Sequence, residues 1–168
     1  MSTEQKNKME SSELLQLVSF KIGVEEFGID ILKVNEIIRM IAITKVPNAP
    51  SFVDGVVNLR GRVIPVINLR LKLSLPRKEY DKNSRIIVVE LNDKTIGFIV
   101  DEVSEVLRIP INITEKPPEM IAGINASFIT AIGKLEDRLL ILLDLEKILG
   151  DGENVELKKM TDNLSKNN

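Results

Sequence analysis

The chain has 168 residues, of which 43% are hydrophobic and 29% charged, with a net charge of −2 and no cysteine, histidine or tryptophan. This composition is typical of a globular protein of one or two small domains, and it excludes disulfides, thiolate nucleophiles, histidine-based catalysis and the usual transition-metal ligands, so no metal and no cofactor are expected. It also gives no electrostatic footprint for nucleic acid, and no apolar run approaches the ~20 residues of a membrane span.

Most of the chain is strand-like, because short runs of Val, Ile and Leu alternate with turn residues. A polar segment, residues 1–13, comes first; it has no signal sequence and is expected to be a flexible tail of a cytoplasmic protein. Tight turns are expected at Gly23–Glu25, Arg60–Gly61, Asn92–Lys94 and Glu136–Arg138. The predicted strands are Leu15–Ile22, Glu26–Ile31, Val56–Leu59, Val63–Ile67, Arg85–Leu91, Thr95–Val100, Ile129–Leu135 and Leu139–Leu143.

Few helices are expected. Apolar residues at positions 34, 37, 38 and 41 have helical spacing and predict a helix over Leu32–Ile41, with Asp30 as its N-cap. The matching segment Asp101–Ile109 fits a strand about as well as a helix.

A short helix is also expected after each of two polar residues, Asn68 and Asp144, which are natural N-caps. These helices would cover 68–73 and 144–150, with Gly150 as a natural stop. The charged stretch 75–84 is the best candidate for a linker. The polar residues 151–168 are expected to form a second flexible tail.

An internal duplication is visible at two places. A shift of 76 positions places Phe52–Leu73 on Phe128–Leu149, and a shift of 69 places Gly28–Met40 on Gly97–Ile109. Two ordered matches at nearly one spacing indicate a duplicated unit. The predicted fold is therefore mainly all-β, with a first small barrel over approximately 14–80 and a second over approximately 84–150. Each copy is marginal in size for independent folding, so the two are expected to share a hydrophobic interface.

Two charged residues are candidates for recognition. Arg60 is expected at the tip of a hairpin, where it is either a solvated turn residue or a contact for a partner. The second copy has Glu136 at this position, so the two copies have diverged there. Glu36 is either part of a solvated face or a recognition residue, since Val34 and Ile37 flank it with apolar surface. Asp101, Glu102 and Asp144 could form an acid/base pair, although a helix cap suits Asp144 better.

Several motifs resemble those of one protein family, the CheW-type coupling proteins of bacterial chemotaxis. They are FGIDILKVNEI, ITKVPNAPSFVDG with Pro47 and Pro50, and NLRGRVIPVINLR, followed by GFIVDEVSEVL and LLILLDLEKIL. The resemblance covers about residues 14–150, the whole predicted core. The same module forms the regulatory domain of the chemotaxis histidine kinase CheA, but no kinase segment precedes it here, which favours a free-standing adaptor.

The resemblance implies two five-stranded β-barrels of the SH3 or OB type that exchange segments. It also implies a non-enzymatic adaptor between the cytoplasmic tips of transmembrane chemoreceptors and CheA, reaching the membrane only through the receptors. The first barrel would bind the regulatory domain of CheA, and the groove between the barrels would receive the receptor tip. Carried over by motif, the contact candidates are Val34, Glu36, Ile37, Arg60 and Val106, while Gly55 and Gly97 would hold backbone geometry as structural turns.

Three other functions remain open at this level. A CheW-like scaffold could serve another sensory or motility pathway. A nucleic-acid-binding barrel is disfavoured by the acidic balance of the chain. A carboxylate-based hydrolase would need a cleft that holds Asp101 or Glu102 with a second acid.

Overall fold

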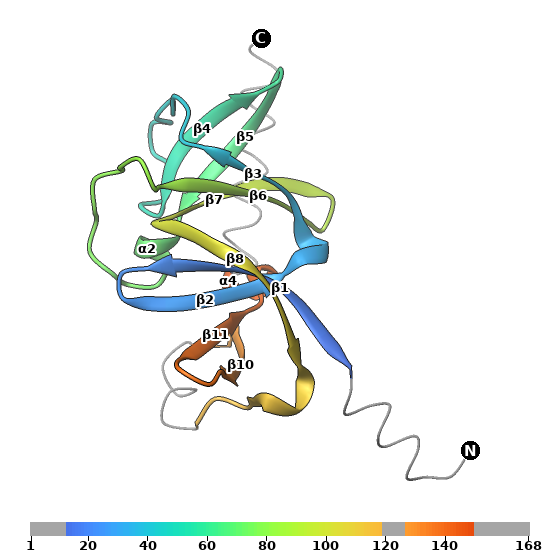
Figure 1. The fold of residues 1–168 in the computed structure, drawn as a ribbon. Coiled ribbons are helices and arrows are strands. Elements are labelled where there is room, and N and C mark those ends of the chain that lie inside the picture. Colours follow the sequence, from blue (N-terminus) through green and yellow to red (C-terminus); the bar gives the residue numbers. More distant parts are fainter. Residues whose placement is uncertain (1–12, 119–126, 150–168) are drawn as a thin grey trace.

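The computed structural model describes residues 13–118 and 127–149 and shows two β-sheets (Figure 1). The two sheets share a hydrophobic core. The five-stranded sheet, called lobe 1, has the strand order β3-β6-β7-β5-β4; the six-stranded sheet, called lobe 2, has the order β8-β1-β2-β11-β10-β9. The predicted mainly all-β fold with few short helices is thus confirmed. The predicted tails lie outside the described residues apart from Glu13, and so does Gly150.

All eight predicted strands are present, with ends within a few residues of the predicted ones. Lobe 1 consists of β3 (Val34–Arg39), β4 (Val53–Leu59), β5 (Arg62–Asn68), the short helix α2 (Leu69–Lys72), β6 (Arg85–Leu91) and β7 (Lys94–Val100). Lobe 2 consists of β1 (Leu14–Ile22), β2 (Glu25–Asp30), β8 (Glu102–Pro110), the 3-10 turn η2 (Ile111–Ile113), β9 (Thr114–Glu115), β10 (Ile129–Lys134), β11 (Leu139–Leu143) and α4 (Leu145–Ile148). A second 3-10 turn, η1 (Ile31–Lys33), connects β2 of lobe 2 to β3 of lobe 1.

The two halves of the chain exchange hairpins. The hairpin β1–β2 from the first half lies in lobe 2 between β8 and β11, and β6–β7 from the second half lies in lobe 1 between β3 and β5. Each exchanged hairpin is joined by a parallel pair, β2 with β11 and β7 with β5. The strand orders of the two lobes are related by the duplication. The predicted boundary near residue 80 therefore does not divide the chain into the two lobes, because each sheet contains strands from both sides of that residue.

One core cluster extends through both lobes. It contains the fully buried Phe20 and Ile22 of β1, Phe98 of β7 and Ile67 of β5, together with Leu145 of α4. Smaller clusters fill the inside of each lobe, around Val66 and Ile86 in lobe 1 and around Leu17 and Leu140 in lobe 2. The expected hydrophobic interface between the two units is confirmed, and it explains how such small units fold.

The predicted helix over Leu32–Ile41 is wrong. Only η1 is helical there, and the residues that follow form β3, which pairs antiparallel with β6. The burial of β3 alternates, but its side chains do not follow it: Glu36 takes a partly buried position and Ile37 an exposed one, so the apolar residues have a spacing that resembles a helix. Asp30 still accepts a hydrogen bond from the backbone N–H of Leu32 at 2.9 Å. The matching segment forms β8, so the strand alternative holds for Asp101–Ile109.

The two short helices predicted after Asn68 and Asp144 are confirmed as α2 and α4. Asn68 Oδ1 accepts a hydrogen bond from the N–H of Leu71 at 3.4 Å, and Asp144 Oδ1 accepts one from the N–H of Glu146 at 3.0 Å. Asp144 is thus a cap, the role that its position predicted.

Gly55 and Gly97 do not lie in turns, since they belong to β4 and β7. Gly55 has φ +149° beside a β-bulge, and a Cβ atom there would lie 2.1 Å from the carbonyl oxygen of Thr44. Thr44 pairs at this point with Val56, which closes lobe 1 between the chain after β3 and the edge strand β4. A Cβ on Gly97 would meet Ile86 and Val66 at 2.7 and 2.9 Å. Both positions therefore need glycine for close approach rather than for a turn.

Candidate functional site

The turn between β4 and β5 brings two predicted site residues together at the end of lobe 1. Arg60 lies in this turn and donates a hydrogen bond to the carboxylate of Glu36 on β3. The Arg60 side chain is 70% exposed, against 31% for Glu36. This hydrogen bond from Arg60 is the main cause that lowers the pKa of Glu36, and it raises the pKa of Arg60. Ile37, beside Glu36, is exposed, and Val34 packs on the shared core.

Arg60 has an unusual backbone conformation. Its φ is +52° and that of Gly61 is +85°, as in the two-residue turns that suit the twist of a hairpin. Asn58 Oδ1 accepts a hydrogen bond from the N–H of Gly61 at 2.8 Å and so stabilises the turn. Asn or Gly is the ordinary choice where Arg60 stands. The backbone therefore carries a small strain to present a guanidinium at the tip.

The matching end of lobe 2 carries the opposite charge. Here Glu136 replaces Arg60, and Arg138 binds the carboxylates of Glu26, Glu105 and Asp137 at 2.5, 3.1 and 2.9 Å. The bond to Glu26, whose side chain is 7% exposed, is the main cause that raises the pKa of Arg138. Lobe 1 thus presents a cation at its end, and lobe 2 presents acids.

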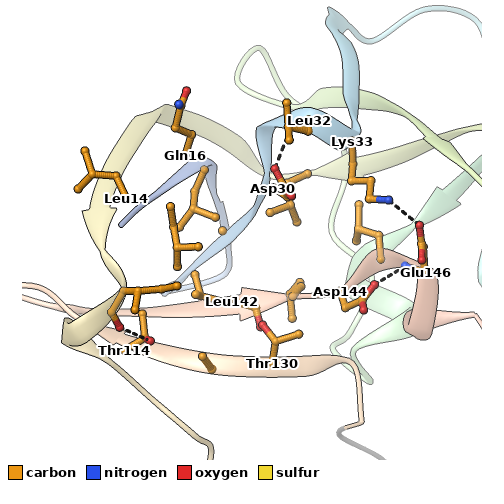
Figure 2. A pocket seen from close by; sticks show the side chains of 18 of the residues that line it. Leu14, Gln16, Asp30, Leu32, Lys33, Thr114, Thr130, Leu142, Asp144 and Glu146 are labelled. Atoms are coloured by element: carbon orange, nitrogen blue, oxygen red, sulfur yellow. Dashed lines mark hydrogen bonds and ion pairs between the residues drawn. The ribbon is translucent and has the colours of Figure 1, made fainter. Parts of the chain in front are cut away.

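A second candidate surface is a groove of about 650 Å³ in lobe 2, called the lobe 2 groove (Figure 2). Its walls are apolar and include Leu17, Ile29 and Leu142. Three apolar residues at the groove are exposed: Leu14 at 52%, Leu32 at 87% and Ile111 at 38%.

Charged residues gather at one end of the lobe 2 groove, near α4. Lys33 Nζ lies 2.7 Å from Glu146 Oε1, and Asp30 and Asp144 lie close by as caps of η1 and α4 (Figure 2). The hydrogen bond to Glu146 is the main cause that raises the pKa of Lys33, and the charges of Asp30 and Asp144 add to it. Three carboxylates against one ammonium leave this end of the groove negative.

The structure places the predicted site residues in two sheets. Glu36, Ile37 and Arg60 lie together at the end of lobe 1, whereas Val106 lies in β8 of lobe 2, opposite Val18, and is 56% exposed. Sequence reasoning missed the lobe 2 groove. One signal was present, because Leu32 is a large apolar residue outside the periodic set of the segment predicted to be a helix.

Comparisons with known proteins agree with this fold over most of the chain. The family model of the CheW-like domain matches residues 16–153. The chain belongs to the CheW-like family. It is 38% identical to the chemotaxis protein CheW of Klebsiella aerogenes, over 90% of this chain and 89% of that protein, and 41% identical to CheW of Helicobacter pylori, over 83% and 84%. The crystal structure of the scaffolding protein TtCheW from Thermoanaerobacter tengcongensis has a TM-score of 0.77 at 35% identity, covering 84% of this chain and 96% of that one.

Membership of the CheW-like family makes this protein a chemotaxis adaptor and not an enzyme. A nucleic-acid-binding barrel, a hydrolase and a scaffold of a different pathway are not favoured. Asp101 pairs with Arg70 at 3.2 Å, and Asp144 caps α4. In residues 13–118 and 127–149, no helix has the length and apolarity required to cross a bilayer.

Proposed function

We propose that this protein couples the cytoplasmic tips of chemoreceptors to the histidine kinase CheA, in the cytoplasm, and reaches the membrane only through the receptors. The observation that carries the proposal is the Arg60–Glu36 pair on the surface at the end of lobe 1, with Ile37 exposed on the opposite face of β3. The turn holds an arginine whose side chain is 70% exposed, in a backbone conformation that favours Asn or Gly, so stability alone does not account for it. It matches the composition of an interface, where arginine and apolar anchors dominate the binding energy.

The two partners would use different surfaces. The end of lobe 1, with Val34, Glu36, Ile37 and Arg60, is assigned to the regulatory domain of CheA. The receptor tip is assigned to the surface between the lobes, where Val106 offers an exposed apolar contact. Val106 stands opposite Val18, a member of the core shared by both lobes, so its side chain faces the same side of the sheet as that core.

Such an adaptor transmits a signal by differential affinity. Because it catalyses no reaction, it can transmit a signal only by binding one conformation of a partner more tightly than another. The pair of Arg60 and Glu36 would give orientation and selectivity, while Ile37 and Val106 would give buried area.

Arg60→Glu is expected to weaken binding of the CheA regulatory domain by about tenfold or more, because it reverses a charge at the centre of the proposed contact. The measurement is co-sedimentation of the purified protein with receptor-containing membranes, with and without CheA, supported by a titration of the isolated regulatory domain. Binding to receptor membranes without CheA is expected to be retained.

Two further variants show how the result for Arg60→Glu should be interpreted. The double variant Arg60→Glu/Glu36→Arg can form the internal ion pair again, so it remains defective only if Arg60 or Glu36 contacts the partner directly. Lys82→Glu makes the same change of charge at an exposed residue far along the chain from the turn and serves as the control. The proposal fails if the unchanged protein sediments with neither partner.

A further inference from the structure

The linker between the two repeats, residues 74–84, runs on the outside of lobe 1 from α2 to β6 and contains neither helix nor strand (Figure 1). Its two ends are fixed, because Leu75 packs against the shared core and Ser84 is buried. Every residue between these ends, 76–83, is exposed. The linker is therefore a surface loop with firm ends, and such a segment can open locally without unfolding of the core.

Side-chain contacts hold the exposed part of the linker on lobe 1. Arg77 donates to Asp54 Oδ1 at 3.2 Å and to the carbonyl oxygen of Ser51 at 3.4 Å. Asn68, the N-cap of α2, donates to the hydroxyl of Tyr80 at 3.3 Å. These distances lie at or beyond the long end of the usual range, and the Arg77 side chain is exposed, so each contact contributes only modestly to docking of the linker.

Arg70 of α2 connects the linker to the crossing between the lobes. Its Nη1 atom donates to the carbonyl oxygen of Pro76 in the linker at 3.4 Å. Its Nε atom donates to Asp101 Oδ1 at 3.2 Å, and the second oxygen of Asp101 accepts from the N–H of Gly23 at 2.8 Å. Gly23 lies in the β1–β2 turn of lobe 2, so a continuous chain of hydrogen bonds runs from the linker through α2 to lobe 2.

The two contacts of Arg70 are expected to support each other. An arginine side chain loses rotamer freedom when its guanidinium is fixed in one position. When the linker already fixes Arg70, the contact with Asp101 requires less additional ordering, and the contact with Asp101 favours docking of the linker for the same reason. Both side chains are mostly buried, so solvent screens their interaction less than it screens a surface pair.

We propose that the linker docks on lobe 1 reversibly, and that Arg70 couples this docking to the contact between α2 and the β1–β2 turn of lobe 2. An event that lifts the linker from lobe 1 loosens the contact at the crossing, and a change at the crossing loosens the linker. The fold thus contains a route from the surface of lobe 1 to lobe 2. The inference rests on the contacts of Arg70 and the exposure of the linker, and it does not depend on the roles assigned to Arg60 and Val106.

The first test lifts the linker and reads the crossing. In the full-length protein, Arg77→Ala is expected to raise the hydrogen-exchange rate of the Gly23 amide about threefold, measured by NMR, and to leave the core amide of Phe20 unchanged. Asp54→Asn weakens the same contact without leaving a buried charge unpaired, and should act in the same direction. Lys78→Ala is the matched control, because the ion pair of Lys78 stays within the linker. The proposal is overturned if Gly23 does not respond, responds equally to the control, or changes together with Phe20.

The second test changes the crossing and reads the linker. Tyr80 is the single tyrosine of the chain, which has no tryptophan, so its fluorescence reports the linker alone. Asp101→Asn removes the charge that holds Arg70, and is expected to increase quenching of Tyr80 by acrylamide about 1.5-fold. Glu146→Gln makes the same change in the pair with Lys33 at the other crossing, and should leave the quenching unchanged. Quenching that rises in both variants or in neither contradicts the proposal.

A third variant, Arg70→Lys, tests whether Arg70 is the link. Lysine keeps a positive charge for Asp101 but lacks the forked guanidinium that reaches Asp101 and the linker at once. In this background, Arg77→Ala should no longer change exchange at Gly23, and Asp101→Asn should no longer change quenching of Tyr80. If either response persists in the Arg70→Lys protein, the coupling does not pass through Arg70 and the proposal is wrong.

Discussion

Gly55→Ala is expected to lower the free energy of unfolding by about 3–5 kcal/mol, as the sum of backbone strain and overpacking. The added Cβ would lie 2.1 Å from the carbonyl oxygen of Thr44 and 2.8 Å from its carbonyl carbon, and backbone atoms cannot swing aside as a side chain can. The φ of +149° adds strain for any residue with a Cβ. Since Thr44 pairs with Val56 to close lobe 1, relief of the clash would open the barrel. Urea unfolding followed by circular dichroism gives the measurement.

Two other glycines separate the contribution of backbone strain from that of overpacking. Gly61 has φ +85° but nothing within 4 Å of the place that an added methyl would take, so Gly61→Ala should cost only about 1 kcal/mol from its backbone. Gly97→Ala meets side chains at 2.7 and 2.9 Å without a positive φ, and is expected to fall between the two. If Gly55→Ala unfolds at the same urea concentration as Gly61→Ala, closure through Thr44 contributes little to stability.

The strands of this fold could be predicted because their signal is local. Alternating Val, Ile and Leu between turn residues located β1, β2, β4–β7, β10 and β11, and the caps Asn68 and Asp144 located both helices. The exchange of hairpins could not be found in the same way. Nothing local in β1–β2 indicates that it pairs with β8 and β11 rather than with β3. In β3, a charged residue at the partly buried position 36 and an apolar one at the exposed position 37 hid the alternation that would have identified a strand.

The candidate site, like the fold, could be predicted only where its signal is local in the sequence. A two-residue turn with Gly61 predicted the hairpin that exposes Arg60, but its partner Glu36 is 24 residues away and the contact depends on how lobe 1 closes. The lobe 2 groove is formed by strands from both halves of the chain, with α4 and η1 at one end. Its residues become neighbours only through the exchange, so no spacing in the sequence indicated it.

Asp101→Ala is expected to lower the free energy of unfolding by about 2–4 kcal/mol, because it leaves the half-buried guanidinium of Arg70 without its charged partner. Asp101 lies where the chain passes from β7 of lobe 1 to β8 of lobe 2. Its carboxylate accepts from Arg70 Nε at 3.2 Å and from the backbone N–H of Gly23 at 2.8 Å, and so joins α2 of lobe 1 to the β1–β2 turn of lobe 2. The side chains are only 14% and 15% exposed, so water replaces the lost contacts only in part.

The duplication offers a control for this prediction at the other crossing between the lobes. There Glu146 stands in the place of Arg70 and pairs with Lys33 at 2.7 Å, but the two side chains are 35% and 47% exposed. Glu146→Ala should therefore change the urea midpoint little, since exposed pairs are screened by water. The double variant Asp101→Ala/Arg70→Met should recover part of the stability lost in Asp101→Ala, because no unpaired charge remains buried. Equal losses from Asp101→Ala and Glu146→Ala would show that burial does not set the strength of these pairs, and that the lobes are held by the apolar core alone.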